Sequence, residues 1–239
     1  MKTALRIGTA GWAIPARVAA AFPTSGSALT RYAATFDAVE INSTFYRAHR
    51  PQTLTRWAAA TPGGFRFAVK APRAVTHDAR LVQCEDAMVQ FLETVAVLGE
   101  KLGPLLVQLP PSLAFDGATA ERFFSSFVAP SGVVCEPRHA SWFEKQADDL
   151  LRRLRVARVA ADPARHPLAG KPGGWDGLAY WRLHGSPRTY WSSYDQTYLH
   201  ELASKLTAGA TRTWCIFDNT ASGAAAHDAL ALQSGLTRA

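Results

Sequence analysis

The sequence predicts an α/β protein, a single-domain, TIM-like (β/α)8 barrel spanning residues 1–239 with a non-helical sixth crossover. Three observations favour this fold class. Strand-like apolar runs alternate with helix-like segments eight times along the chain, which is typical of right-handed βα crossovers and a parallel sheet. No linker or low-complexity stretch divides the 239 residues. A doubly wound open sheet is the alternative, but the sequence has neither its G-x-G-x-x-G loop nor a P-loop.

The first part of the chain opens with an apolar strand at 4–9. Ser27 can cap a helix, because its hydroxyl can accept a hydrogen bond from a free backbone N–H of the first turn. A short apolar strand at 38–42 follows. The next helix is short and ends at the Pro-Gly-Gly run 62–64, since neither residue type continues a helix well. Alternating apolar and basic residues at 65–70 predict the third strand.

Apolar residues at helical spacing predict a helix over about 84–100. The continuous apolar run 105–109 is typical of a buried strand and is closed by two prolines. A Phe-rich helix is predicted around 119–128, before the strand at 133–136.

Ser141 and Glu144 have the spacing of a capping box and predict the start of the fifth helix. A sixth strand is predicted at 156–161. Residues 163–177 are rich in Pro and Gly and too short for a full crossover helix. The remaining elements are a strand at 178–184, a helix at 195–207, a strand at 213–217 and an Ala-rich helix from about 222.

Composition is that of a globular protein, with 48% hydrophobic and 19% charged residues. No apolar run of about 18 residues and no signal-peptide pattern is found, so no membrane partner is expected. Three widely spaced cysteines, Cys84, Cys135 and Cys215, disfavour a disulfide framework and predict a reducing, cytoplasmic location. The net charge of +7 fits an anionic partner, but an Ala- and Arg-rich composition raises the charge without any function. Both interpretations stay open.

Strand alternation predicts which polar side chains point inward. In strand 38–42, Val39 and Ile41 share one face, whereas Glu40 and Asn42 share the other. A carboxylate in so apolar a strand is costly unless it faces a polar cavity. The same test places further polar residues at the inner wall near the barrel mouth: Lys70, Gln108, Glu136, Arg182 and His184. Asp162 joins them at the end of strand six. The last strand is apolar on both faces, so alternation does not distinguish Asp218 from Asn219.

Arg138 and His139 follow the fifth strand and are expected on the same rim, with Tyr46 as part of an aromatic wall for a ring-shaped ligand. Active sites of such barrels lie at the carboxyl ends of the strands. A buried ion-pair network without chemistry remains the structural alternative for Glu40, Lys70 and Arg182.

These motifs also resemble one family. The matching stretches are GTAGW at 8–12, VEINSTFYR at 39–47, FRFAVK at 65–70, LVQLPP at 106–111, EPRH at 136–139, YWRLHG at 180–185 and FDNT at 217–220. In this order they are similar to the YecE-like family, known as domain of unknown function 72. The resemblance implies a TIM-like barrel and no settled activity. Ser186-Pro187 and Asp218 depart from the residues that many members carry, which would alter the choice of ligand.

The function that fits most residues is metal-independent acid–base catalysis, as a hydrolase or a lyase/isomerase, on a small anionic or sugar-like, possibly phosphorylated, substrate. Glu40 or Glu136 would act as the general base and His184 as the general acid or its partner. Lys70, Arg138 and Arg182 would hold negative charge, while Asn42, Tyr46, Gln108, His139, Asp218 and Asn219 complete the binding site. No cofactor is expected. A metal site is disfavoured by the neighbouring cations and by the absence of an H-E-x-x-H motif.

The alternative is a nucleic-acid-binding barrel that uses its basic surface and its tryptophans. Its main basic segment includes Arg152, Arg153 and Arg155, which the predicted helix places on the outside of the barrel, away from the mouth. No oligomeric state is predicted.

Overall fold

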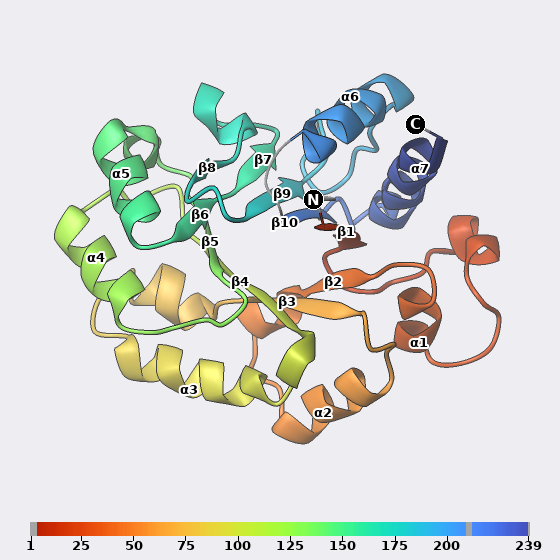
Figure 1. The fold of residues 1–239 in the computed structure, drawn as a ribbon, viewed down its shortest axis with the longest axis horizontal. Helices are drawn as coiled ribbons and strands as arrows, with labels where there is room; N and C mark the ends of the chain where they lie inside the picture. The colour runs from red at the N-terminus through yellow and green to blue at the C-terminus, as the bar shows by residue number, and fades with distance from the viewer. Residues whose placement is uncertain (1–3, 209–211, 239) are drawn as a thin grey trace.

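The computed structural model describes residues 4–208 and 212–238. Within them the strands form two sheets (Figure 1). The first has the order β1 (Ala4–Thr9), β10 (Arg212–Phe217), β9 (Ala179–Leu183) and β7 (Ala160–Asp162), all parallel. The second has the order β2 (Ala38–Ile41), β3 (Arg66–Lys70), β4 (Leu102–Gln108), β5 (Val133–Glu136), β6 (Val156–Arg158) and β8 (Gly173–Gly174). Only the short β8 pairs antiparallel among these described strands. The predicted α/β class with parallel sheets is confirmed.

The two sheets are linked at two places. Ala10, just after β1, forms a parallel bridge with Glu40 of β2, and the N–H of Gly11 donates to the Glu40 carbonyl at 2.9 Å. At the other place the predicted sixth strand is divided into β6 and β7. Between them, the N–H of Val159 donates to Cys135 O at 2.8 Å. One stretch of chain therefore passes from the second sheet into the first.

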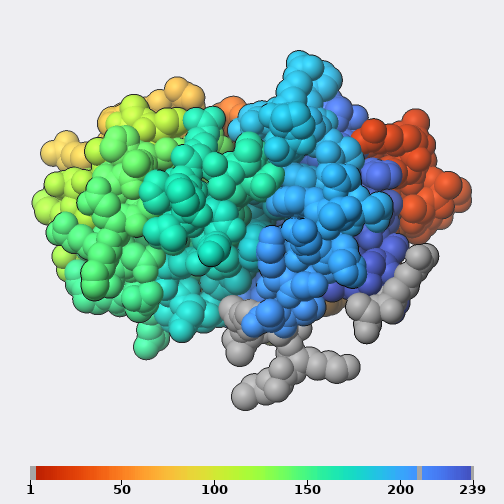
Figure 2. Space-filling model, turned by 90° about the horizontal axis from the view of Figure 1, so that it is seen from above, coloured from red at the N-terminus to blue at the C-terminus, as the bar shows by residue number. Residues whose placement is uncertain are grey.

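The α-helices surround the strands in Figure 1, and Figure 2 shows the face on which α6 lies beside the segment that follows α5. Their bounds are α1 (Ala28–Ala33), α2 (Pro51–Ala59), α3 (Glu85–Ala96), α4 (Gly117–Ser125), α5 (Lys145–Arg153), α6 (Gln196–Thr207) and α7 (Ala224–Arg238). Short 3-10 or π helices lie in the connections: η1 (Ala16–Ala21), η2 (Asn42–Phe45), η3 (Ala74–Asp78), η4 (Gly99–Lys101), η5 (Ala140–Phe143) and η6 (Pro167–Gly170). The sixth crossover, 163–178, holds η6 and β8 but no α-helix.

Helix starts follow local hydrogen bonding. Ser27 caps α1 as predicted, since its Oγ accepts the N–H of Thr30 at 3.1 Å. The predicted capping box of Ser141 and Glu144 is wrong. Ser141 lies in η5 and its Oγ accepts the N–H of Phe115 at 2.7 Å, so it is already engaged by a distant loop and α5 begins only at Lys145.

Apolar residues form two separate clusters on opposite faces of the strands. The larger cluster packs between strands and helices and includes Val39 and Ile41. The smaller cluster consists of residues that alternate along the strands with those of the larger one, and it forms an inner apolar layer. Its members are Ala38, Ala68, Leu106, Val134, Ala157, Val159, Leu178, Tyr180, Trp214 and Ile216. Because side chains alternate along a strand, the residues two positions further on point the same way. That spacing places the polar cluster described next.

Candidate functional site

A polar layer lies directly beyond the inner apolar layer, at the carboxyl ends of the strands. Each member follows an inner apolar residue by two positions, except His184, which follows Arg182 by two. All are nearly excluded from solvent, between 0% and 5% exposed: Glu40, Lys70, Gln108, Glu136, Arg182, His184 and Asp218. The layer therefore brings together six side chains predicted from strand alternation and Asp218, which alternation did not distinguish from Asn219.

Arg182 occupies the centre of this layer. Its Nε and Nη2 donate to the two oxygens of Glu40 at 3.0 and 2.7 Å. Its Nη1 donates to Glu136 at 2.8 Å and Nη2 also donates to Asp218 at 2.9 Å. The Tyr180 hydroxyl, from the inner apolar layer, donates a hydrogen bond to Glu40 Oε2 at 2.9 Å. Charge-assisted and bidentate bonds of this kind are the strong class of hydrogen bond, so the three carboxylates are fixed around one guanidinium.

His184 bridges two of the same carboxylates. Its Nε2 lies 2.9 Å from Glu136 Oε1 and its Nδ1 lies 3.0 Å from Asp218 Oδ2. Burial alone would lower the pKa of His184, but Glu136 and Asp218 outweigh burial and raise it above the usual value. Burial would likewise raise the pKa of Glu136, yet Arg182 and His184 hold it well below the usual range. Both shifts favour an imidazolium at His184 that is held by an ionised Glu136.

A cavity of about 210 Å³ opens beside this pair. Its lining includes Glu136, Arg138, Arg165, His184 and Tyr190. Arg138 lies at the edge of this cavity. Its Nη2 is 3.3 Å from Glu136 Oε1 and 3.5 Å from the Tyr190 hydroxyl. The cavity therefore combines a carboxylate, an imidazole and two guanidinium groups.

Lys70 ends β3 in the same layer. Its Nζ lies 4.2 Å from the centre of the Phe45 ring, and no hydrogen bond joins it to any residue in the described ranges. Burial, followed by the charge of Arg182, lowers the pKa of Lys70 to about 8, although Glu40, Glu136 and Asp218 act in the opposite direction. This amine is mostly protonated at neutral pH, but a larger fraction of it is neutral than in an ordinary lysine.

Other predicted site residues lie away from this cluster. Tyr46 is 74% exposed, beside Phe45. His139 binds Ser141 and caps η5. Asn219 donates to Ser192 O and to Asp228, so Asp218 is the inward residue of the pair that alternation left undecided.

Asn42 begins η2, and its Oδ1 is buried without a partner among the described residues. Asp162 was expected to join the cluster at the end of strand six. Its Oδ1 instead accepts from Tyr194 at 2.9 Å.

Sequence reasoning missed Tyr180, Phe45, Arg165 and Tyr190. Tyr180 could have been found, because it has the same strand parity as Arg182. The other three are outside the strands, in η2 and in the loops that follow β7 and β9, where no periodic pattern indicates direction.

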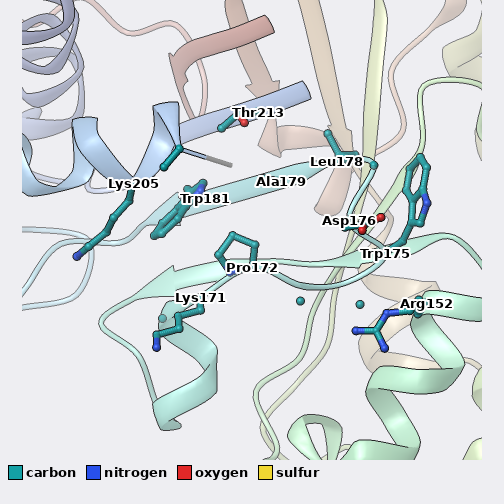
Figure 3. Close-up of a pocket in the computed structure, with 15 residues that line it drawn as sticks. Arg152, Lys171, Pro172, Trp175, Asp176, Leu178, Ala179, Trp181, Lys205 and Thr213 are labelled. Atoms are coloured by element: carbon teal, nitrogen blue, oxygen red, sulfur yellow. The ribbon is translucent and has the colours of Figure 1, made fainter. Parts of the chain in front are cut away.

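Four larger cavities lie elsewhere in the described chain, and two of them bear on the choice of site. One of about 460 Å³ borders η2 and α3 and includes Phe45, Tyr46 and Arg73. The other, of about 1020 Å³, is lined by Trp181, Trp175 and Lys205 among others, and it opens where the sixth crossover has no α-helix (Figure 3). None of the predicted site residues lines this cavity. We therefore choose the candidate site by the charged side chains that converge on it and not by the volume of its cavity.

Within the cluster, the three carboxylates face the cationic side chain of Arg182 and the ring of His184. No group of three or more His, Cys, Asp or Glu side chains in residues 4–208 and 212–238 is arranged to hold a metal ion. The carboxylates converge on Arg182 instead.

On the outer surface, Arg152 pairs with Asp148 at 3.0 Å and Arg153 with Glu121 at 2.7 Å. No helix in the described ranges has the length and apolar character needed to cross a membrane.

The fold and this layer define an α/β protein with parallel sheets and a buried charged cluster at the carboxyl ends of its strands. Residues 6–239 match the family described as protein of unknown function DUF72. The chain belongs to that family, which confirms the resemblance seen in its motifs.

Curated relatives are the UPF0759 proteins YecE of Escherichia coli. The K12 protein is 30% identical over 152 residues, which cover 61% of this chain and 56% of the relative. The O157:H7 protein is 31% identical over 124 residues, 52% of this chain and 46% of the relative. The match thus spans about half the length of these relatives.

Solved structures show the same fold. A DUF72 family protein from Enterococcus faecalis V583 superposes with a TM-score of 0.82 at 21% identity, covering 98% of this chain and 95% of the other. One from Thermotoga maritima MSB8 gives 0.80 at 25% identity, covering 98% and 99%. A xylose isomerase-like TIM barrel/4-hydroxyphenylpyruvate dioxygenase fusion protein gives 0.50 at 13% identity, with 96% of this chain on 41% of that one.

Proposed function

We propose that the two sheets together act as one TIM-like barrel and that the whole chain, 1–239, is a single domain. The bridge from Ala10 to Glu40 and the shared strand through Val159 support this closure at both places. The fold likeness to a TIM barrel supports it as well. In such a barrel the carboxyl end is the place of chemistry. The buried free cysteines fit a cytoplasmic location.

In this barrel the chain is a metal-independent acid–base enzyme, a hydrolase or a lyase/isomerase. Its substrate is a small anionic or polyhydroxylated molecule, phosphorylated in the simplest case. One observation carries this proposal: a single cavity is lined together by Glu136, His184, Arg138 and Arg165. Arginine forks suit phosphate and carboxylate groups, and an imidazolium beside them supplies a proton.

The roles follow from burial and from proton affinity. His184, kept protonated by Glu136 and Asp218, is the proton donor. A substrate atom that replaces Glu136 Oε1 in front of Nε2 would receive the proton. Glu136 stays ionised, so it accepts hydrogen bonds from substrate hydroxyls and is a weak base. Lys70, with a pKa of about 8, is the better base near neutral pH.

Glu40 has a positioning role in this proposal. It is fully buried, and both of its oxygens are engaged by Arg182 and Tyr180. It holds Arg182, which in turn orients Glu136 and Asp218. The expectation that Glu40 acts as a base gives way to this role because neither oxygen faces the cavity lining.

Nucleic-acid binding has weaker support as a function. The exposed arginines of α5 already pair with Asp148 and Glu121, which leaves less free charge for phosphates. Retention on DNA or RNA at low salt, lost as salt rises, would favour that alternative over the small-molecule site.

The test is a thermal-shift screen of phosphorylated metabolites and sugars against the wild type, Glu136→Gln, Arg138→Met and a control, Arg122→Met. Arg122 is exposed on α4, away from the cavity. We expect at least one anionic or polyhydroxylated compound to stabilise the wild type and the control but not the two site variants. If both site variants keep every stabilisation seen in the wild type, the site is wrongly assigned.

A further inference from the structure

The amine of Lys70 differs from the other amines whose surroundings the structure describes. Lys101 is also partly buried, but its Nζ donates to the carbonyls of Ala58 and Thr61. Lys145 and Lys205 are exposed and lie beside Asp149 and Glu201. Lys70 is 5% exposed, and its Nζ lies 4.2 Å from the centre of the Phe45 ring without a hydrogen bond to a residue in the described ranges. No hydrogen bond of the kind made by Lys101 therefore fixes this amine in a structural role.

The position of Lys70 is that of a reactive group. It ends β3 in the polar layer, beside the three carboxylates and Arg182 that influence its charge. Phe45 covers one side of the amine, with the centre of its ring 4.2 Å from Nζ. A lysine in an apolar pocket next to another cation is the arrangement that activates an amine as a nucleophile. Glu136, one of its charged neighbours, also lines the 210 Å³ cavity.

We propose that Lys70 forms a covalent imine with an aldehyde or ketone carbonyl of the substrate. This inference rests on the proposed function and narrows its substrate class to anionic or polyhydroxylated carbonyl compounds. Glu136 and His184 lie within the same layer, so the carbonyl carbon would be held next to groups that accept hydrogen bonds and donate protons.

The step balances without a further reactant. The neutral amine of Lys70 attacks the carbonyl carbon, a C–N bond forms, and the carbonyl electron pair moves to oxygen, which takes up the proton that the attacking nitrogen loses. The carbinolamine then loses that oxygen as water, with a proton supplied by His184, and the nitrogen lone pair forms the C=N bond. A protonated imine remains, and it withdraws electrons from the neighbouring carbon.

The charge of the cluster favours this product. A protonated imine carries the same single positive charge as the ammonium that it replaces. Glu40, Glu136 and Asp218 continue to face one cation at this position, and the Phe45 ring continues to lie against it. The reaction therefore requires no new buried charge, which would otherwise be its main cost.

Reductive trapping tests the proposal. The full chain is incubated near pH 7 with glyceraldehyde or glyceraldehyde 3-phosphate and sodium cyanoborohydride, which reduces an imine to a stable secondary amine. Peptide mass spectrometry then gives the rate of modification at each lysine. A pKa of about 8 leaves about a tenth of the amine neutral at pH 7, against less than about a thousandth for an ordinary lysine. We expect Lys70 to react at least ~10-fold faster than the exposed Lys145.

Two variants complete the test. Lys70→Arg keeps the positive charge and should lose the fast adduct while the other lysines react as before. Arg138→Met should slow trapping by the phosphorylated aldehyde more than trapping by glyceraldehyde. Labelling of Lys70 no faster than Lys145 would overturn the imine. If ligand stabilisation still depends on Arg138 in that case, the proposed function stands; if Lys70 is labelled without any such dependence, the imine stands and the anion site falls.

Discussion

Arg182 and Glu40 form a bidentate ion pair with both side chains fully buried, and this pair joins the two sheets. Arg182 comes from β9 of the first sheet and Glu40 from β2 of the second. The bonds measure 3.0 Å from Nε and 2.7 Å from Nη2. A guanidinium fork matches a carboxylate in a fixed orientation, so the pair sets the relative position of strands that are not neighbours in either sheet.

Removing one charge of this pair should therefore destabilise the protein strongly. Glu40→Gln leaves Arg182 with a neutral partner at a fully buried position, and we expect a loss of about 3–5 kcal/mol in the free energy of unfolding. Urea denaturation measures it. Glu93→Gln, on the exposed side of α3, is the control and should change stability by less than about 0.5 kcal/mol. Equal stability of the two variants would mean that the pair does not hold the sheets.

His184 should contribute stability that depends on pH. Its folded pKa is raised above the unfolded value, so its contribution is complete below the unfolded value of about 6.5 and is lost as pH rises through the folded pKa. We expect the difference in unfolding free energy between wild type and His184→Gln to be larger near pH 6 than near pH 9. His200→Gln, exposed on α6, should show no such trend. An unchanged difference across this range would contradict an imidazolium at position 184.

Strand alternation predicted most of the inward layer because each strand is short and apolar on its other face. Glu40, Lys70 and Glu136 each follow a buried inward residue by two positions, and this spacing is visible in the sequence. Alternation could not separate Asp218 from Asn219, because β10 is buried on both faces. It placed Asp162 wrongly, because Tyr194 takes up that carboxylate from a loop.

The features that the sequence did not predict depend on contacts between segments far apart in the chain. Nothing local to Arg165 or Tyr190 shows that two separate loops meet beside Glu136. Ser141 has the spacing of a cap, but a bond to Phe115, 26 positions away, determines its place. The sixth strand reads as one apolar run, and only its two different partners, β5 and β9, divide it.

Lys70 should lower the stability of the fold. Its pKa falls from the unfolded 10.5 to about 8, a shift worth roughly 3 kcal/mol at about 1.4 kcal/mol per unit. Because the unfolded chain binds more protons between these values, stability rises with pH across about 8 to 10.5, and the full cost is present below 8. Lys70→Met removes this cost but also the contact of the amine with Phe45. We expect a net gain of about 1–2 kcal/mol at pH 7 that shrinks above pH 8.

Lys101→Met is the matched control for this gain. It removes an amine that donates to the carbonyls of Ala58 and Thr61, so it should lower stability. Denaturant unfolding at pH 7 and pH 10 separates the two cases. A loss of stability in Lys70→Met as large as that in Lys101→Met would show that the amine of Lys70 has a structural role.

The junction of β1 and β2 should be sensitive to a single methyl group. At Gly8 an added Cβ would lie 2.1 Å from the carbonyl oxygen of Ala38, a backbone atom that cannot move aside alone. The hydroxyl of Tyr32 fills the same junction, accepting the N–H of Thr9 at 2.8 Å and donating to Ala38 O at 3.1 Å. Gly8→Ala would force β1 and β2 apart and break the two hydrogen bonds by which the Tyr32 hydroxyl joins Thr9 to Ala38.

We expect Gly8→Ala to cost about 3 kcal/mol or more in the free energy of unfolding, at the upper end of overpacking effects, and to speed amide hydrogen exchange in β1 and β2. Gly63→Ala is the matched control, because no atom lies within 4 Å of its added Cβ, and it should change stability by less than about 0.5 kcal/mol. If Gly8→Ala is as stable as this control, the sheets do not meet closely at β1 and β2. In that case the carbonyl of Ala38 could not lie where it accepts the hydrogen bond of the Tyr32 hydroxyl. The proposed closure of the barrel between β1 and β2 would then be wrong.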